Sequence, residues 1–128
     1  MAPHPQTIIP PRTFDLEGFT AAVKAKDADR WSDYFDEDAE WLEFRHDQPP
    51  SHPHRMQGNI AIHAGLRSVC AGDYGMDVED SAMSGPNVWF RLVLTRPDGS
   101  RVLEHVHLAL AENGLIHRQT DIEAWDLT

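Results

Sequence analysis

The sequence predicts an α+β fold, in which helices precede a run of antiparallel strands. In three segments before residue 72, apolar residues recur at the three- and four-residue spacing of helices. After residue 75, apolar and polar residues alternate in four successive segments that short turns connect. Turns this short join antiparallel strands, whereas parallel strands need long crossovers. The 128 residues, 41% of them hydrophobic, are enough for one domain with its own core.

Three helices are expected in the first part of the chain. Thr13 or Asp15 is the candidate cap of the first helix, Asp27 is the cap of the second, and Gly58 precedes the third. The acidic run at residues 36–38 is expected to end the second helix at the surface. Each helix carries an apolar stripe, and the three stripes are Leu16, Phe19 and Val23; Ala28, Trp31 and Phe35; and Ile62, Leu66 and Val69.

Five strands complete the predicted domain. The first covers residues 39–46, where Trp41, Glu43 and Arg45 alternate with Leu42, Phe44 and His46. Residues 48–55 contain three prolines, which remove backbone donors, so this segment is expected to be a loop. The later strands are predicted over residues 76–83, 87–96, 101–111 and 115–125, with turns at Pro97-Asp98-Gly99 and Glu112-Asn113-Gly114.

Composition excludes several classes of partner. Asp and Glu number 21 against 11 Lys and Arg, which gives a formal charge of −10. This charge repels phosphate groups and anionic lipids, so we expect neither nucleic acid nor a membrane as partner. Cys70 is the single cysteine, which excludes an intramolecular disulfide and suits the cytoplasm, where we expect the protein. Four prolines predict an extended arm over residues 1–12, and residues 13–128 then form the single domain.

The order of these elements resembles the nuclear transport factor two-like fold, and within it the SnoaL-like group. The resemblance covers residues 14–126 and includes the sequence from Glu112 to Asp126. It implies that the three helices pack in the concave face of a strongly curved, mostly antiparallel sheet, forming a conical, cystatin-like cup. It also implies a homodimer through the convex face of the sheet. Proteins of this fold perform many unrelated functions, so the function depends on the residues that line the cup.

The resemblance also implies a site on the last two strands. In SnoaL-like cyclases and in limonene epoxide hydrolases, an acidic residue of the last strand, seven places after the hairpin glycine, lies in the cup and transfers protons. Counting from Gly114 assigns this position to Asp121. The cyclases carry a histidine on the neighbouring strand, which here corresponds to His105 and His107. Alternation places these two histidines on one face of their strand.

The turn at residues 112–114 decides whether the histidines share a face with Asp121. A three-residue loop ending in Gly114 pairs His105 with Asp121, whereas a two-residue loop pairs Val106 with Asp121. Glycine at the third position favours the three-residue loop, so we expect the first register. The inner face would then contain Leu103, His105, His107, Ala109, His117, Gln119, Asp121 and Glu123, and the outer face Val102, Val106, Leu108, Leu110, Ile116 and Ile122.

Such an arrangement predicts general acid–base chemistry. Burial raises the pKa of a carboxyl group and a neighbouring imidazolium lowers it, so Asp121 would act as base or acid while His107 and His105 orient it or polarise the substrate. We expect a small hydrophobic, oxygenated substrate and no cofactor. Isomerisation, cyclisation, dehydration and hydrolysis all remain open. The side chains expected to line the pocket are Trp41, Phe44, Met76, Met83, Trp89, His117 and Gln119.

Two other interpretations of the sequence remain. The first is a domain that binds a ligand or dimerises without catalysis. The second is a metal site formed by His105 and His107, with His52 or His54 of the proline-rich loop as a further ligand. We expect no metal, because prolines restrict that loop without directing its histidines toward the strands.

Overall fold

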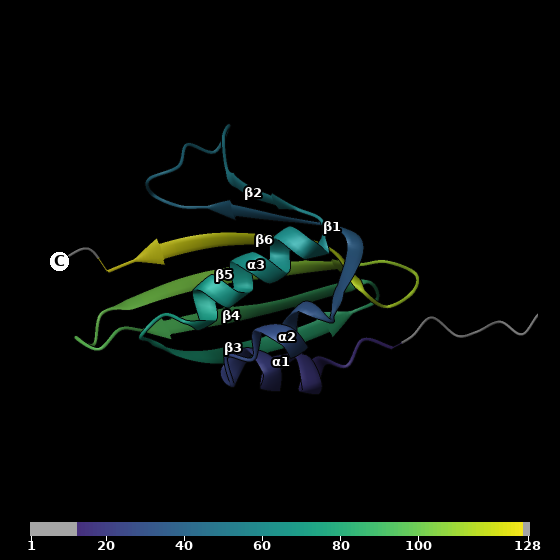
Figure 1. Ribbon diagram of the computed structural model, residues 1–128, viewed down its shortest axis with the longest axis horizontal. Helices are drawn as coiled ribbons and strands as arrows, with labels where there is room; N and C mark the ends of the chain where they lie inside the picture. The colour runs from purple at the N-terminus through teal and green to yellow at the C-terminus, as the bar shows by residue number, and fades with distance from the viewer. Residues whose placement is uncertain (1–12, 127–128) are drawn as a thin grey trace, which may run out of the picture.

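The computed structural model describes residues 13–126, so the predicted arm at residues 1–12 lies outside the described residues. The described residues form three helices and six strands, which are labelled in Figure 1. The helices are α1 (Leu16–Lys24), α2 (Ala28–Ser32) and α3 (Asn59–Cys70), and the strands are β1 (Phe35–Phe44), β2 (His54–Gln57), β3 (Gly75–Ser84), β4 (Asn87–Thr95), β5 (Arg101–Leu110) and β6 (Ile116–Trp125). Strand β2 begins within the last residues of the predicted proline-rich loop. Within residues 13–126, no helix is both long and apolar enough to span a bilayer.

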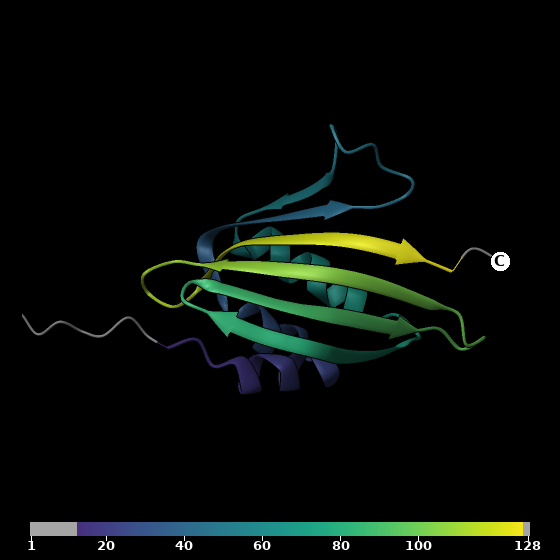
Figure 2. The same cartoon turned by 180° about the vertical axis from the view of Figure 1, so that it is seen from behind.

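The six strands form one sheet in the order β2-β1-β6-β5-β4-β3. Strands β1 and β6 pair in parallel, and every other neighbouring pair is antiparallel. The helices lie against one side of the sheet, which we call the helix-covered face (Figure 1). The opposite side, which we call the open face, lies in front in Figure 2. The prediction of an α+β fold, with three helices packed on a mostly antiparallel sheet, is confirmed.

Local sequence explains where the first two helices begin. The Asp15 carboxylate accepts a hydrogen bond of 2.9 Å from the backbone N–H of Gly18, and the Asp27 carboxylate accepts one of 3.1 Å from that of Arg30. Each carboxylate therefore satisfies an N–H group that has no partner within its helix. These two contacts confirm Asp15 and Asp27 as the caps.

The second helix is shorter than predicted, because its expected last turn belongs to β1. Helix α2 ends at Ser32, and the acidic run at residues 36–38 lies in the strand. Phe35 pairs with Ile116 of β6, and the Phe35 ring stacks on Trp41 with 5.6 Å between ring centres. Tertiary pairing of Phe35 therefore outweighs the helical spacing of the local sequence.

The core lies between the helices and the helix-covered face. Phe19 of α1 makes edge-to-face contacts with the rings of Trp31, Tyr34 and Phe90. Ile62 and Leu66 of α3 are also buried, as their spacing predicts. Burying an aliphatic or aromatic side chain of this size contributes about 1.5–3 kcal/mol. These contacts attach each helix to the sheet.

A β-bulge in the last hairpin changes the register that the sequence predicts. The three-residue loop is present, since Ala111 N–H donates to Leu115 O at 2.8 Å, Gly114 has φ of 81°, and Leu110 pairs with Ile116. The next pair joins Ala109 to Arg118, which leaves His117 as an extra residue. From that point Val106, and not His105, opposes Asp121. The predicted register is wrong because one inserted residue exchanges the two faces of a strand.

Candidate functional site

Asp121 is completely buried on the helix-covered face. Its side chain is 0% exposed, its Oδ2 accepts a hydrogen bond of 2.8 Å from Trp41 Nε1, and its Oδ1 accepts one of 2.9 Å from Gln119 Nε2. The parallel pairing of β1 with β6 sets these contacts, because it places Trp41 beside Gln119 and Glu43 beside Asp121. Trp41 and Gln119, which the sequence predicts near Asp121, are therefore its direct hydrogen-bond partners.

Three further carboxyl groups lie on the same face around Asp121. Glu43 is opposite Asp121 across β1 and β6, and Glu104 is opposite Glu123 across β5 and β6. Glu123 Oε1 accepts a hydrogen bond of 2.9 Å from Trp125 Nε1. Glu104 is buried, whereas Glu43 and Glu123 are partly exposed. We call Glu43, Glu104, Asp121 and Glu123 the carboxyl cluster.

The surroundings of Glu43, Glu104 and Asp121 raise the pKa values of these three carboxyl groups. Burial raises the pKa of Glu43 to about 7, with a further upward contribution from Glu123 and an opposing one from Arg45. Burial also raises the pKa of Glu104 well above its usual range, and the charges of Asp121 and Glu123 add to this effect. For Asp121, burial raises the pKa well above its usual range, although the hydrogen bonds from Gln119 and Trp41 oppose the rise. Glu43 can therefore take up and release a proton near neutral pH.

No cationic side chain described in residues 13–126 forms an ion pair with the carboxyl cluster. Arg45 is the basic residue whose charge lowers the pKa of Glu43. Its Nε forms an ion pair with Asp47 Oδ1 at 3.2 Å. The Arg45 guanidinium also lies 6.0 Å from the ring centre of Trp125. Among the described residues the cluster therefore has no lysine or arginine ion-pair partner, and Arg45 opposes the rise in the pKa of Glu43 only in part.

The predicted pairing of Asp121 with histidines is wrong. His105 is exposed on the open face, and His117 is exposed at the bulge. His107 also lies on the open face, where its Nε2 is 2.9 Å from Asn87 Oδ1 and its ring stacks on Trp89. The physical reason is the bulge at His117, which leaves Asp121 on the helix-covered face and turns the two β5 histidines away from it.

The inner and outer faces predicted for β5 are therefore exchanged. Val102, Val106 and Leu108, which the sequence predicts on an outer dimer surface, are core residues. Leu103 and Ala109 lie on the open face, by the alternation of side chains along the strand. On β6, Gln119, Asp121 and Glu123 lie on the inner, helix-covered face, as the sequence predicts. All three follow the bulge at His117 in the chain.

The remaining predicted pocket residues do not gather around Asp121. Met76 is buried in the core, whereas Met83 is exposed near the end of β3. Phe44 and Trp89 lie on the open face, since Phe44 pairs with the exposed Ile122 and Trp89 pairs with His107.

Five hollows with volumes of 180 to 550 Å³ are described on the molecule. None of these five hollows is lined by a member of the carboxyl cluster.

The possible metal ligands also differ from those predicted. Among the described residues, the side chains close enough to share an ion are Glu43, Asp121 and Glu123, with one oxygen atom of each lying within 4.8 Å of the others. This group contains no histidine, so the interpretation based on His105 and His107 has no support in the geometry. Carboxylate oxygens are ligands that hard cations prefer.

Sequence reasoning missed Glu43 and Glu104 as site residues. In each case, the alternation of side chains along the strand indicates that the residue shares a face with buried apolar residues. Glu104 is the only acid in the stripe that it forms with Val102, Val106 and Leu108, and an isolated acid in an apolar stripe indicates a buried carboxyl group. Glu43 alternates with Trp41, so it shares the face of that buried aromatic residue.

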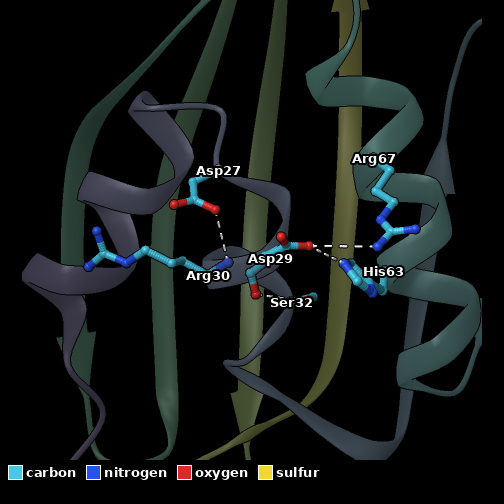
Figure 3. Close-up of polar contacts among 6 residues, drawn as sticks. All are labelled: Asp27, Asp29, Arg30, Ser32, His63 and Arg67. Atoms are coloured by element: carbon cyan, nitrogen blue, oxygen red, sulfur yellow. Dashed lines mark hydrogen bonds and ion pairs between the residues drawn. The ribbon is translucent and has the colours of Figure 1, made fainter.

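A second polar group connects α2 to α3 (Figure 3). His63 Nε2 lies 2.7 Å from Asp29 Oδ1, and Arg67 Nη2 lies 4.0 Å from the same oxygen. The Asp29 side chain is 78% exposed, and ion pairs in such surroundings contribute about 0–1 kcal/mol. This group links two helices at the surface and is a weaker candidate site than the buried carboxyl cluster.

Comparisons with known proteins agree with this fold. No curated protein matches the sequence. A proposed ketosteroid isomerase from Kribbella flavida DSM 17836 is similar in structure, with a TM-score of 0.68, 20% identity, and coverage of 88% of this chain and 75% of that chain. An NTF2-like protein of unknown function from Burkholderia xenovorans LB400 has a TM-score of 0.70 and 22% identity, and the match covers 88% and 82% of the two chains.

A third similar structure is an NTF2-like protein of unknown function from Mesorhizobium loti. Its TM-score is 0.72 at 15% identity, with 83% of this chain and 84% of that chain covered. At these identities the solved structures show the fold alone.

The SnoaL-like domain family matches residues 16–119, which is most of the chain. The protein therefore belongs to the SnoaL-like domain family.

Proposed function

We propose that this SnoaL-like protein is an enzyme that moves a proton on a small, apolar, oxygen-containing molecule. Glu43 is the group that takes up and returns the proton. The position of Glu43 carries the proposal, because this residue is partly exposed at the edge of a carboxyl cluster without a cationic partner. A pKa raised to about 7 leaves the carboxyl near half ionisation at neutral pH, where it serves as base and then as acid.

The other members of the cluster support Glu43 in different ways. Glu123 is partly exposed, and its charge adds to the rise in the pKa of Glu43. Asp121 has no exposed surface, and both of its oxygens are already hydrogen-bonded, so we assign it a positioning role. This division differs from the sequence-based prediction, in which Asp121 itself exchanges the proton with the help of histidines.

Isomerisation is the reaction that fits these groups most simply. A carboxylate removes a proton from the carbon next to a carbonyl group, and the same carboxyl returns the proton to another carbon. The reaction uses neither water nor a cofactor, and one carboxyl group with a pKa near neutrality can serve first as the base and then as the acid. The similar Kribbella protein is itself a proposed ketosteroid isomerase, which makes a steroid ketone a suitable probe.

The test measures isomerisation of a β,γ-unsaturated steroid ketone by the ultraviolet absorption of its conjugated product. The variant Glu43→Gln should lower kcat by about 100- to 10,000-fold, the usual contribution of a general acid–base group. Glu37→Gln, an exposed position on the same strand, is the matched control and should retain the activity. Activity of Glu43→Gln within a few fold of the unchanged protein would exclude Glu43. Absence of turnover on this ketone and on a small cyclic β,γ-unsaturated ketone would refute the isomerase assignment.

A non-catalytic ligand-binding domain is the second candidate function. It is favoured by the observation that the carboxyl cluster lines none of the five described hollows. Under this alternative, a bound small molecule would be recovered chemically unchanged. Glu43→Gln would then alter neither its affinity nor its fate.

We also propose that the open face forms a homodimer interface. Ile122 is 63% exposed and Trp89 is 44% exposed on this face, which no helix of the described chain covers (Figure 2). Large exposed apolar side chains on one sheet face are typical of a subunit contact. In analytical ultracentrifugation, Ile122→Glu should convert the dimer to a monomer. Ile60→Glu, at an exposed position of α3, should leave the dimer intact. A monomeric unchanged protein would refute this proposal.

A further inference from the structure

We propose that Trp125 is a positioning residue, whose indole N–H holds Glu123 beside Glu43 and so controls how readily Glu43 transfers its proton. This role rests on the proposed function, because it adds a residue to the same proton-transfer site. Its first support is a direct contact, since Trp125 Nε1 donates a hydrogen bond of 2.9 Å to Glu123 Oε1. The two residues stand two positions apart on β6, so their side chains leave the strand on the same face.

Three side chains that follow the ends of β1 and β4 hold the Trp125 ring. The Arg96 guanidinium lies 5.2 Å from the ring centre, and the Arg45 guanidinium lies 6.0 Å from it. The His46 ring meets the indole edge to face, with 5.1 Å between the ring centres. A cation placed over an indole is attracted by the electrons of the ring. These contacts restrain the indole, so that its N–H stays directed at Glu123.

Glu123 lies close enough to Glu43 for its position to affect proton transfer. One carboxyl oxygen of each residue lies within 4.8 Å of the other. Like charges at this separation repel each other in partly buried surroundings, and the charge of Glu123 adds to the rise in the pKa of Glu43. Both side chains are partly exposed. Without the N–H of Trp125, the Glu123 carboxylate would be free to turn toward solvent, and the pKa of Glu43 would move back toward its ordinary value.

The other charged groups around Glu43 do not have this freedom. Asp121, opposite Glu43 on β6, is completely buried, and both of its oxygens already accept hydrogen bonds. Glu104 of β5 is also buried, and Arg45 is held in an ion pair with a neighbouring aspartate. Within residues 13–126, Glu123 is thus the acid of the carboxyl cluster that can turn away from Glu43. The other ionisable side chains on the elements packed beside β1 include His54, opposite Glu43 on β2, and His63, Arg67 and Cys70 on α3.

Nuclear magnetic resonance of protein labelled with ¹³C at the glutamate carboxyl groups tests this role, because it follows the titration of Glu43 and needs no turnover. Trp125→Phe keeps an aromatic ring but loses the N–H, and the titration midpoint of Glu43 should fall by about 0.5 to 1 on the pH scale. Glu123→Gln removes the charge itself and should lower the midpoint at least as far. Trp89→Phe, the same change on the open face, is the matched control and should leave the midpoint in place.

The pH dependence of ketone isomerisation supplies a second readout. The acidic limb of the kcat/KM profile reports the ionisation of the base in the free enzyme, so this limb should move to lower pH in Trp125→Phe. A merely structural role for Trp125 would lower kcat/KM at every pH and leave the limb in place. If the protein isomerises no ketone, the proposed function fails, whereas the resonance titration still decides the role of Trp125.

Two results would overturn the role of Trp125. The first is a Glu43 midpoint in Trp125→Phe that equals the midpoint in the unchanged protein. The second needs no variant and therefore applies even if Trp125→Phe fails to fold. It is an indole N–H resonance of Trp125, in the unchanged protein, that stays constant across the pH range in which Glu43 titrates. A connection through Glu123 requires this resonance to change with the midpoint of Glu43.

Discussion

Glu43→Gln tests whether burial among carboxyl groups raises the proton affinity of Glu43 in the folded protein. Because its folded pKa of about 7 lies above the ordinary value of 4.5, the folded state binds this proton more tightly than the unfolded state. The stability linked to Glu43 is therefore fully present below about pH 4.5. It is lost as the pH rises to about 7. Glutamine does not ionise, so Glu43→Gln should remove this part of the pH dependence.

The magnitude follows from the two pKa values of Glu43. The rise from 4.5 to about 7 corresponds to about 3 kcal/mol, since each tenfold change in proton affinity is worth about 1.4 kcal/mol. The unchanged protein should thus lose up to about 3 kcal/mol through Glu43 between pH 4.5 and pH 8. Glu43→Gln should match the unchanged protein within about 1 kcal/mol at acidic pH and exceed its stability by about 2–3 kcal/mol at pH 8.

The assay is urea unfolding, followed by tryptophan fluorescence, at a series of pH values between 5 and 8.5. Linear extrapolation of the free energy of unfolding to water provides the stability at each pH. Glu37→Gln is the matched control on the same strand, and its pH profile should follow that of the unchanged protein. If Glu43→Gln and the unchanged protein lose stability in parallel across this range, the reasoning about Glu43 is refuted.

Three further outcomes are expected. Trp41→Phe removes the N–H that donates to Asp121 at 2.8 Å and should lower the free energy of unfolding by about 1–3 kcal/mol; a loss below about 0.5 kcal/mol in urea unfolding would contradict this contact. His105→Ala should leave ketone isomerisation within twofold, because His105 lies on the open face, and a large fall in kcat would contradict the observed register. Asp29→Asn should cost at most about 1 kcal/mol in the same unfolding assay, since its ion pair with His63 is largely exposed, and a cost above 2 kcal/mol would show a stronger link between α2 and α3.

The helices illustrate what the linear sequence predicts well. Asp15 and Asp27 cap α1 and α2 because a short acidic side chain bonds to an N–H only three residues away. The end of α2 was predicted wrongly, because Phe35 pairs with Ile116, which lies far along the chain. Helical spacing at Phe35 carried no information about that partner.

In the candidate site, the sequence predicted the position of Asp121 but not the residues around it. The position of Asp121 in the last strand follows from the hairpin glycine and the family resemblance, and its burial agrees with them. Its partners follow from the register, which depends on whether His117 is paired or bulged. The sequence-based prediction therefore placed histidines next to Asp121, whereas the folded chain places Glu43 and Glu104 in its neighbourhood.

Local patterns in the chain are thus sufficient for the class of fold, the helix caps, the loop at Gly114 and the order of the elements other than β2, because each depends on neighbours a few residues away. Strand β2 (His54–Gln57) was not predicted, and it forms by pairing with β1. The face on which each β5 side chain lies depends on the one extra residue at His117. The alternation of apolar and polar residues does not predict this bulge. The raised pKa of Glu43 likewise comes from burial and from Glu123, eighty positions later in the chain. Only the tertiary structure brings such groups together, because desolvation and charge repulsion depend on distance in space.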